Sequence, residues 1–170
     1  DAKAGFLNDT NVKINNGVLV DNRMRTNVED IYAAGDVCEA PDFFTGEPMM
    51  NPILPSAVEQ GKISGANMAG EDTEYEGDIS MNVFNFFGNK AISMGLAVSE
   101  GGDLQVMKHE STRKNRFKKL VYKNDRLVGA ALVNVDVDPG LFLYLIRKRV
   151  EMDSYTDMLF EKPKETSRWL

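Results

Sequence analysis

The sequence has very few of the residues on which redox and disulfide chemistry depend. Among 170 residues there is one cysteine, one histidine and one tryptophan. The single Cys38 excludes an internal disulfide framework and a Cys-x-x-Cys redox pair within the chain. A chain with so little cysteine suits a reducing compartment, so we expect a cytoplasmic protein.

Positive charge and long apolar runs are also scarce. The chain has 20 Lys and Arg against 26 Asp and Glu, which gives a net charge of −6. Such an acidic chain is poorly suited to phosphate backbones, so we expect no nucleic-acid partner. No apolar run reaches the roughly 18 residues of a membrane span, and the first residues do not have the pattern of a signal peptide. Because the chain begins with Asp1 rather than Met, we expect a processed protein or part of a longer one.

The sequence divides into two halves that differ in composition and in hydrophobic pattern. Residues 1–78 are rich in Asn, Gly and Pro with short apolar runs, whereas residues 79–170 show clear strand alternation. The acidic, Gly-bounded stretch at 70–78 has no periodicity and predicts a linker. We therefore expect two domains, 1–78 and 79–170. The predicted fold class is an α/β fragment followed by a small α+β domain with an antiparallel sheet.

The first half contains two short apolar runs and one helical pattern. The runs at 17–20 and 31–34 predict buried parallel strands. A helix is predicted over 56–69, because Ser56 and Glu59 have the spacing of a capping box and Gly70 suits a left-handed cap.

Small residues recur every four positions along this predicted helix, at Ala57, Gly61, Gly65 and Ala69. Glycine inside a helix costs about 1 kcal/mol relative to alanine, so the pattern needs a reason. Either another backbone or a flat ligand approaches closely, or the helix packs tightly on a sheet.

The second half predicts five strands and two helices. Asn124 and Asp125 indicate a tight hairpin turn. Pro139 stands at the tolerated first position of a helix. The predicted strands cover 83–87, 91–96, 104–108, 117–122 and 127–133, and a short helix is expected at 153–160.

The clearest chemical pattern is a short apolar run that ends in a Gly-Asp pair. Thr26 precedes the run at 31–34, and Gly35 and Asp36 follow it. A carboxylate at the carboxyl end of a parallel strand lies where open α/β sheets bind ligands. An ionised aspartate accepts two hydroxyl hydrogen bonds, which suits a sugar or sugar-alcohol chain.

The segment TNVEDIYAAGDV at 26–37 resembles the second flavin-binding motif of the pyridine nucleotide-disulfide oxidoreductases. The neighbouring residues resemble the branch of coenzyme A disulfide reductase, NADH oxidase and rubredoxin reductase. This resemblance implies that Asp36 holds the ribityl chain of FAD, with Gly35 and Val37 beside it. It also implies that the backbone at the start of the predicted helix meets the flavin ring, at Leu54, Pro55 and Ser56. A positive helix end would stabilise negative charge on a reduced flavin.

The family's glycine fingerprints for the FAD pyrophosphate and for the nicotinamide cofactor do not occur in this sequence. The resemblance therefore implies only the carboxy-terminal portion of such an enzyme. The whole enzyme would move hydride from NADH or NADPH to FAD and electrons on to an acceptor, as a homodimer. We expect this portion alone to be inactive. The alternative is a non-catalytic dimerisation or partner-docking module.

No catalytic residue or metal ligand is assigned within the chain. His109 is expected to be a surface residue on a strand, and Cys38 a structural one, because acidic neighbours disfavour a thiolate. A basic cluster is expected to be a solvated face, with docking of an acidic electron-transfer protein as the alternative. This cluster comprises Arg113, Lys114, Arg116, Lys118 and Lys119.

Overall fold

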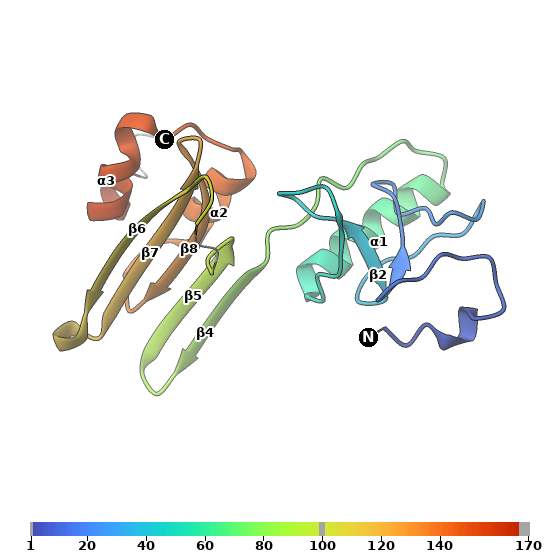
Figure 1. Ribbon diagram of the computed structural model, residues 1–170, viewed down its shortest axis with the longest axis horizontal. Helices are drawn as coiled ribbons and strands as arrows, with labels where there is room; N and C mark the ends of the chain where they lie inside the picture. Colours follow the sequence, from blue (N-terminus) through green and yellow to red (C-terminus); the bar gives the residue numbers. More distant parts are fainter. Residues whose placement is uncertain (1, 99–100, 167–170) are drawn as a thin grey trace. The chain divides into compact units, whose positions relative to one another are not determined.

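The computed structural model describes residues 2–98 and 101–166. The chain divides into two compact units, Asp1–Asp78 and Ile79–Leu170, which are shown in Figure 1. The expected fold class is confirmed, because a parallel strand pair with one helix is followed by an α+β unit whose sheet is antiparallel. Within the described ranges, no helix is long and apolar enough to cross a membrane.

The first unit contains little regular structure. Its sheet has the order β1-β2-β3, in which β1 runs parallel to β2 and β2 antiparallel to β3. A small apolar core includes Val18, Met24, Ala40 and Tyr75. The elements are η1 (Gly5–Leu7), β1 (Val18–Leu19), β2 (Cys38–Pro41), β3 (Pro48–Met49) and α1 (Leu54–Met68).

The strand predicted at 31–34 is wrong. Tyr32 forms only an isolated antiparallel bridge with Arg25, and the strand that pairs with β1 is β2. A strand is defined by its hydrogen-bonded partner, and an apolar run cannot show which partner it has. As a result, Asp36 lies in the turn that precedes β2 in the sequence and not at the carboxyl end of a strand.

Helix α1 begins earlier than predicted, and its capping box is absent. Ile53 stands at the N-cap, no side chain accepts a hydrogen bond there, and Pro55 lies in the first turn. Ser56 is therefore already inside the helix and cannot cap it. The predicted left-handed cap is confirmed: Gly70 has a φ of +91°, and its amide donates to the carbonyl of Asn67.

The segment 70–78, predicted to be a linker, packs against the first unit instead. Tyr75 is buried in the core of the unit. The guanidinium of Arg23 contacts the carboxylates of Asp72 at 2.5 Å and Glu74 at 2.7 Å. The acidic residues that suggested a solvated linker therefore have a cationic partner about 50 positions earlier in the sequence.

The second unit is built on one five-stranded antiparallel sheet with the order β4-β5-β8-β7-β6. All five predicted strands are confirmed, with ends shifted by a few residues. Asn124 and Asp125 both have positive φ, at 49° and 56°, as a two-residue type I′ hairpin turn requires. The strands are β4 (Met81–Phe86), β5 (Asn89–Gly95), β6 (Leu104–Ser111), β7 (Arg116–Lys123) and β8 (Arg126–Val133).

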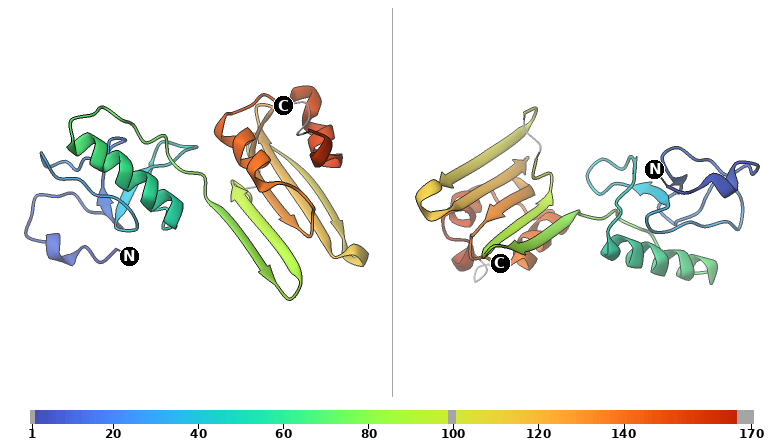
Figure 2. Two further views of the ribbon diagram at one scale, coloured as in Figure 1. Left: turned by 180° about the vertical axis from the view of Figure 1, so that it is seen from behind. Right: turned by 90° about the horizontal axis from the view of Figure 1, so that it is seen from below.

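The helices of this unit cover one face of the sheet (Figure 2). The predicted helix at Pro139 is confirmed as α2, and the carboxylate of Asp138 caps it by accepting from the amide of Gly140. Leu120 and Leu132 of the sheet and Phe142 of the helix are almost completely buried. The remaining elements are η2 (Thr112–Lys114), α2 (Pro139–Arg147), η3 (Asp153–Tyr155), α3 (Thr156–Glu161) and α4 (Pro163–Thr166).

Candidate functional site

The turn at Gly35 and Asp36 packs against helix α1. Gly35 has a φ of +82°, and a Cβ added there would lie 3.4 Å from the Cβ of Ala57. Glycine is favoured here by the positive φ, and the 3.4 Å distance is an ordinary van der Waals contact, so the turn packs directly against the helix. The two segments that sequence reasoning assigned to a cofactor are therefore neighbours in space, although about twenty positions separate them in the sequence.

Asp36 is exposed at this turn, and Val37 beside it is half-buried. No hydrogen bond or ion pair of the Asp36 side chain occurs among the residues that the structure describes. A carboxylate in this state can accept hydrogen bonds from a ligand without giving up a partner in the protein.

Gln60 of helix α1 holds the turn by hydrogen bonds, a role that sequence reasoning missed. Its Oε1 accepts from the amide of Gly35 at 2.8 Å and from the thiol of Cys38 at 3.3 Å. Its Nε2 donates to the hydroxyl of Tyr75 at 3.3 Å. Gln60 is 3% exposed, so these bonds form away from water and satisfy both ends of its amide. A polar residue one turn after Ser56 on a buried helical face was the available signal.

The first turn of α1 presents a mixed surface. Leu54 and Pro55 are exposed, whereas Ser56 is fully buried. The hydroxyl of Ser56 donates to the carboxylate of Asp78 and accepts from Nδ2 of Asn51 at 3.1 Å. Its side chain is therefore committed inside the unit, and only its backbone amide is available to a ligand.

Ile53 at the N-cap offers no side-chain acceptor, and Pro55 has no amide hydrogen, so the amides of Leu54 and Ser56 have no side-chain acceptor among the described residues. The positive end of the helix dipole adds to them, so this helix start favours negative charge in front of it. The two glycines among the small residues that recur along α1 are not explained by close packing within this chain. Nothing within the described chain lies within 4 Å of a Cβ added at Gly61 or Gly65, so neither backbone nor sheet approaches those positions there.

Cys38 is a buried structural residue, as expected. Burial is the main cause that raises the pKa of its thiol to about 11, and the nearby charge of Asp36 raises it further. The thiol therefore stays protonated at neutral pH and donates to the carbonyl of Gly35 and to Gln60. His109 is exposed on β6, an edge strand of the second unit, which confirms the surface position predicted for it.

A cavity of about 280 Å³ in the first unit does not include any of the six predicted cofactor residues. It is lined by Arg25, Thr26, Val28, Glu29, Asp30 and Tyr32. This cavity is therefore separate from the residues predicted to bind the cofactor. The described residues contain no cluster of histidine, cysteine and acidic side chains that could hold a metal ion.

Comparison with known proteins shows which family the sequence of this chain resembles. Residues 2–72 match the model of the pyridine nucleotide-disulphide oxidoreductases. The chain is 36% identical over 167 residues to the epsilon subunit of an NADH-dependent phenylglyoxylate dehydrogenase from Aromatoleum evansii, covering 96% of this chain and 39% of that protein. It is 32% identical over 136 residues to an NADH-rubredoxin oxidoreductase from Clostridium acetobutylicum, covering 79% of this chain and 33% of that one.

A solved structure has the same fold. An NAD-dependent persulfide reductase from A. fulgidus superposes with a TM-score of 0.78 at 24% identity, covering 92% of this chain and 32% of that one. The chain thus spans between about a third and two fifths of the length of these proteins. The resemblance predicted from the Gly-Asp motif is confirmed, and the chain belongs to the pyridine nucleotide-disulphide oxidoreductase family.

Proposed function

We propose that this chain supplies one wall of an FAD site in a longer flavoprotein that takes hydride from NADH or NADPH and passes electrons to an acceptor. The observation that carries the proposal is the packing of the Gly35 turn on Ala57. This contact brings an exposed carboxylate next to an uncapped helix start. A cofactor with a polyhydroxylated chain and an electron-accepting ring needs both kinds of group.

The residues at the turn fit the ribityl part of FAD. Asp36 is exposed and has lone pairs available for two hydroxyl groups. Because Gly35 has no side chain, a ligand can approach the backbone of the turn closely. Asp36 would therefore bind and orient the chain of the cofactor.

The start of α1 fits the ring. Bound FAD would accept a hydride and become electron-rich, and the helix start favours added negative charge. Leu54 and Pro55 are exposed there and offer apolar contact area, while the backbone of Ser56 offers an amide. Ser56 acts through this amide alone, because its hydroxyl is bonded to Asp78.

Gln60 is a positioning residue in this proposal. It touches no ligand, but it joins the turn, through the amide of Gly35, to helix α1 and to Tyr75. A turn held at a buried amide keeps Asp36 at a fixed distance from the helix start, and such preorganisation reduces the entropy lost on binding.

The Asp36→Ala variant tests the proposal in the polypeptide encoded by the gene that contains these residues. Loss of hydrogen bonds to a charged acceptor is expected to weaken FAD binding about tenfold or more. The ratio of flavin absorbance to protein absorbance after gel filtration measures how much FAD remains bound. The Asp9→Ala variant, which removes another exposed carboxylate from the same unit, is the control. Equal flavin content in Asp36→Ala and the unsubstituted protein would reject the assignment.

We also propose that electrons leave the flavin for a separate acceptor protein. One relative is named for rubredoxin, which supports an electron-transfer protein as the partner. The expected result is that the flavoprotein, reduced by NADH, is reoxidised faster by such a protein than by oxygen alone.

A second candidate function is dimerisation through the sheet of the second unit. The face of the sheet opposite the helices, named the open face, carries Phe84 and Phe86 on β4, which are 53% and 57% exposed. Their register partners Ala91 and Asn89, and Val133 beyond Ala91, lie on the same face and are half-buried. An exposed apolar face of this kind suits a second copy of the chain.

Light scattering on the protein and on a Phe84→Asp variant tests this candidate. The unsubstituted protein is expected to be a dimer and the variant a monomer, because a buried unpaired charge opposes association. The Phe6→Asp variant changes an even more exposed aromatic residue, in the first unit, and is expected to leave the dimer intact. A monomeric unsubstituted protein would reject dimerisation and leave the FAD proposal untouched.

A further inference from the structure

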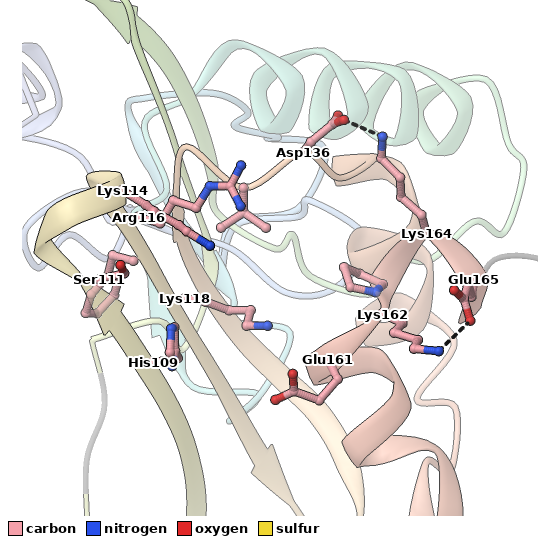
Figure 3. A pocket seen from close by; sticks show the side chains of 13 residues that line it. His109, Ser111, Lys114, Arg116, Lys118, Asp136, Glu161, Lys162, Lys164 and Glu165 are labelled. Carbon is pink, nitrogen blue, oxygen red and sulfur yellow. Dashed lines mark hydrogen bonds and ion pairs between the residues drawn. The ribbon is translucent and has the colours of Figure 1, made fainter.

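A cleft of about 460 Å³ opens in the second unit and includes none of the residues assigned to the FAD site. Its walls come from the β6–β7 hairpin on one side and from the segment around α3 and α4 on the other (Figure 3). The volume falls within the range of roughly 300–1,000 Å³ that is usual for small-molecule sites. Its volume therefore suits a small ligand.

The register of the hairpin explains why polar side chains line the cleft. His109 pairs with Lys118, and Ser111 with Arg116, on the face of the sheet that also carries Leu120. Leu120 is fully buried beneath the helices, whereas Arg116 and His109 are exposed. These side chains thus stand where the helical cover of the sheet ends.

Positive charge exceeds negative charge around the cleft. Its cationic residues are Lys114, Arg116, Lys118, Lys162 and Lys164, and its acidic residues are Asp136, Glu161 and Glu165. Five cations and three acids leave an excess of two positive charges, in a chain whose net charge is −6. This local excess is opposite in sign to the rest of the molecule.

Two of the cations are already paired. Lys164 forms an ion pair with Asp136, and the ammonium of Lys162 lies 3.4 Å from a carboxylate oxygen of Glu165. Lys114 and Arg116 form no ion pair within the described residues. Their N–H donors are thus available to a ligand, although the charge of Arg116 also acts on Asp136 and contributes to lowering its pKa.

Lys118 is held in place at the inner side of the cleft. Its ammonium donates to the carbonyl of Phe160 and lies 4.1 Å from the centre of the phenyl ring of that residue. One of its three donors is used in this way, and the others can serve a ligand. An ammonium fixed by two contacts loses little further freedom on binding.

We propose that this cleft binds a small anion that carries a phosphoryl group. The guanidinium of Arg116 provides the planar fork that matches two phosphoryl oxygens, and Lys114 and Lys118 add positive charge in the same cleft. The excess of two positive charges matches the dianionic state of a phosphate monoester at neutral pH. Neither the family match nor the FAD proposal assigns a role to these residues.

Calorimetric titration of the 170-residue chain with inorganic pyrophosphate, and separately with AMP, tests the proposal. Saturable binding with one site is expected for at least one of them, and it should weaken as sodium chloride rises from 20 to 200 mM. If AMP binds more tightly than pyrophosphate, the cleft also contacts the nucleoside. If pyrophosphate binds more tightly than AMP, the cleft recognises the charge of the phosphoryl groups and not the nucleoside.

The Arg116→Gln variant is expected to weaken this binding about tenfold, since a charge-assisted fork is lost. The Arg113→Gln variant is the matched control, because Arg113 is exposed in the same hairpin and does not line the cleft. It should change the affinity less than twofold. Thermal melting curves confirm that both variants are folded.

Absence of saturable binding at millimolar pyrophosphate and AMP would overturn the proposal. Equal weakening by Arg113→Gln and Arg116→Gln would also overturn it, because general charge and not the cleft would then attract the anion. Binding of an acidic electron-transfer protein without binding of either small anion would identify a docking surface instead.

Discussion

The two units of this chain are stabilised in different ways. In the first, helix α1 buries polar residues, including Ser56, Gln60 and Asn67, while Leu54 and Met68 on the same helix are exposed. In the second, the long strands and α2 bury an apolar core that includes Leu120, Tyr122 and Phe142. The first unit has only a small apolar core and depends more on specific hydrogen bonds, whereas the second depends more on apolar burial.

This difference shows where binding geometry resides. Hydrogen bonds are directional, so the bonds made by one buried side-chain amide can fix the position of a turn relative to a helix. Apolar packing alone does not determine that position. The same hydrogen bonds of Gln60 that stabilise the first unit also hold the proposed cofactor turn. In the second unit the stabilising core and the cationic cleft use different residues, so the cleft can be altered without loss of the fold.

The largest expected effect is on the core of the second unit. Replacement of Phe142, which is 1% exposed, by alanine is expected to destabilise this unit by about 3–5 kcal/mol, since a large cavity forms. Urea denaturation, followed through the NMR signals of backbone amides in each unit, measures this loss in the free energy of unfolding. Signals from the first unit should keep their midpoint.

Tyr144 provides the control on the same helix, because it is 51% exposed. Its replacement by alanine should change the free energy of unfolding by about 0.5 kcal/mol or less. Equal losses for Phe142→Ala and Tyr144→Ala would contradict the view that apolar burial stabilises this unit.

The fold of the second unit could be predicted from the sequence because its signals are local. Alternating apolar residues located the strands, and Asn124 and Asp125 located a hairpin turn that requires positive φ. Pro139 marked the start of α2 in the same way, whereas the cap formed by Asp138 was not predicted. Each of these features depends on neighbours within a few residues along the chain.

The first unit was predicted less well because its structure depends on contacts distant in sequence. The run at 31–34 is apolar, but it has no strand partner beyond one bridge to Arg25. Ser56 has the spacing of a capping residue but bonds to Asp78 inside the unit. The position of the Gly-Asp turn beside the helix start followed from the family motif, whereas the role of Gln60 did not.

A smaller effect is expected for Gln60→Leu in the first unit. The half-buried amide of Gly35 and the buried hydroxyl of Tyr75 would each lose a partner, at a cost of about 1–3 kcal/mol. Iodoacetamide labelling of Cys38 at pH 8 reports the opening of this unit, because burial raises the pKa of its thiol to about 11.

Labelling should be faster in Gln60→Leu than in the unsubstituted protein. Lys62, which is exposed on the same helix, supplies the control, and Lys62→Ala should leave the rate unchanged. Equal labelling rates in the Gln60→Leu variant and the unsubstituted protein would show that the buried amide does not stabilise the first unit.

The smallest effect is expected for the exposed ion pairs of Arg23. Its hydrogen bond and charge hold the pKa of the Asp72 carboxyl below the ordinary value of 3.8. A lowered pKa in the folded state gives a contribution that is present above pH 3.8 and is lost as the pH falls through the lowered pKa.

The Arg23→Gln variant should therefore be slightly less stable than the unsubstituted protein at pH 7, and the difference should vanish in stronger acid. Thermal melting of the first unit at a series of pH values measures it. High salt should also reduce the difference, because both groups face solvent. A difference that grows in acid would contradict this assignment.

A crystal structure of the full-length protein with FAD bound tests the central claim most directly. We predict that a carboxylate oxygen of Asp36 lies about 2.5–3.0 Å from a ribityl hydroxyl oxygen, with the first turn of α1 facing the flavin ring. A structure in which FAD is bound elsewhere and Asp36 remains in contact with water alone would contradict the account.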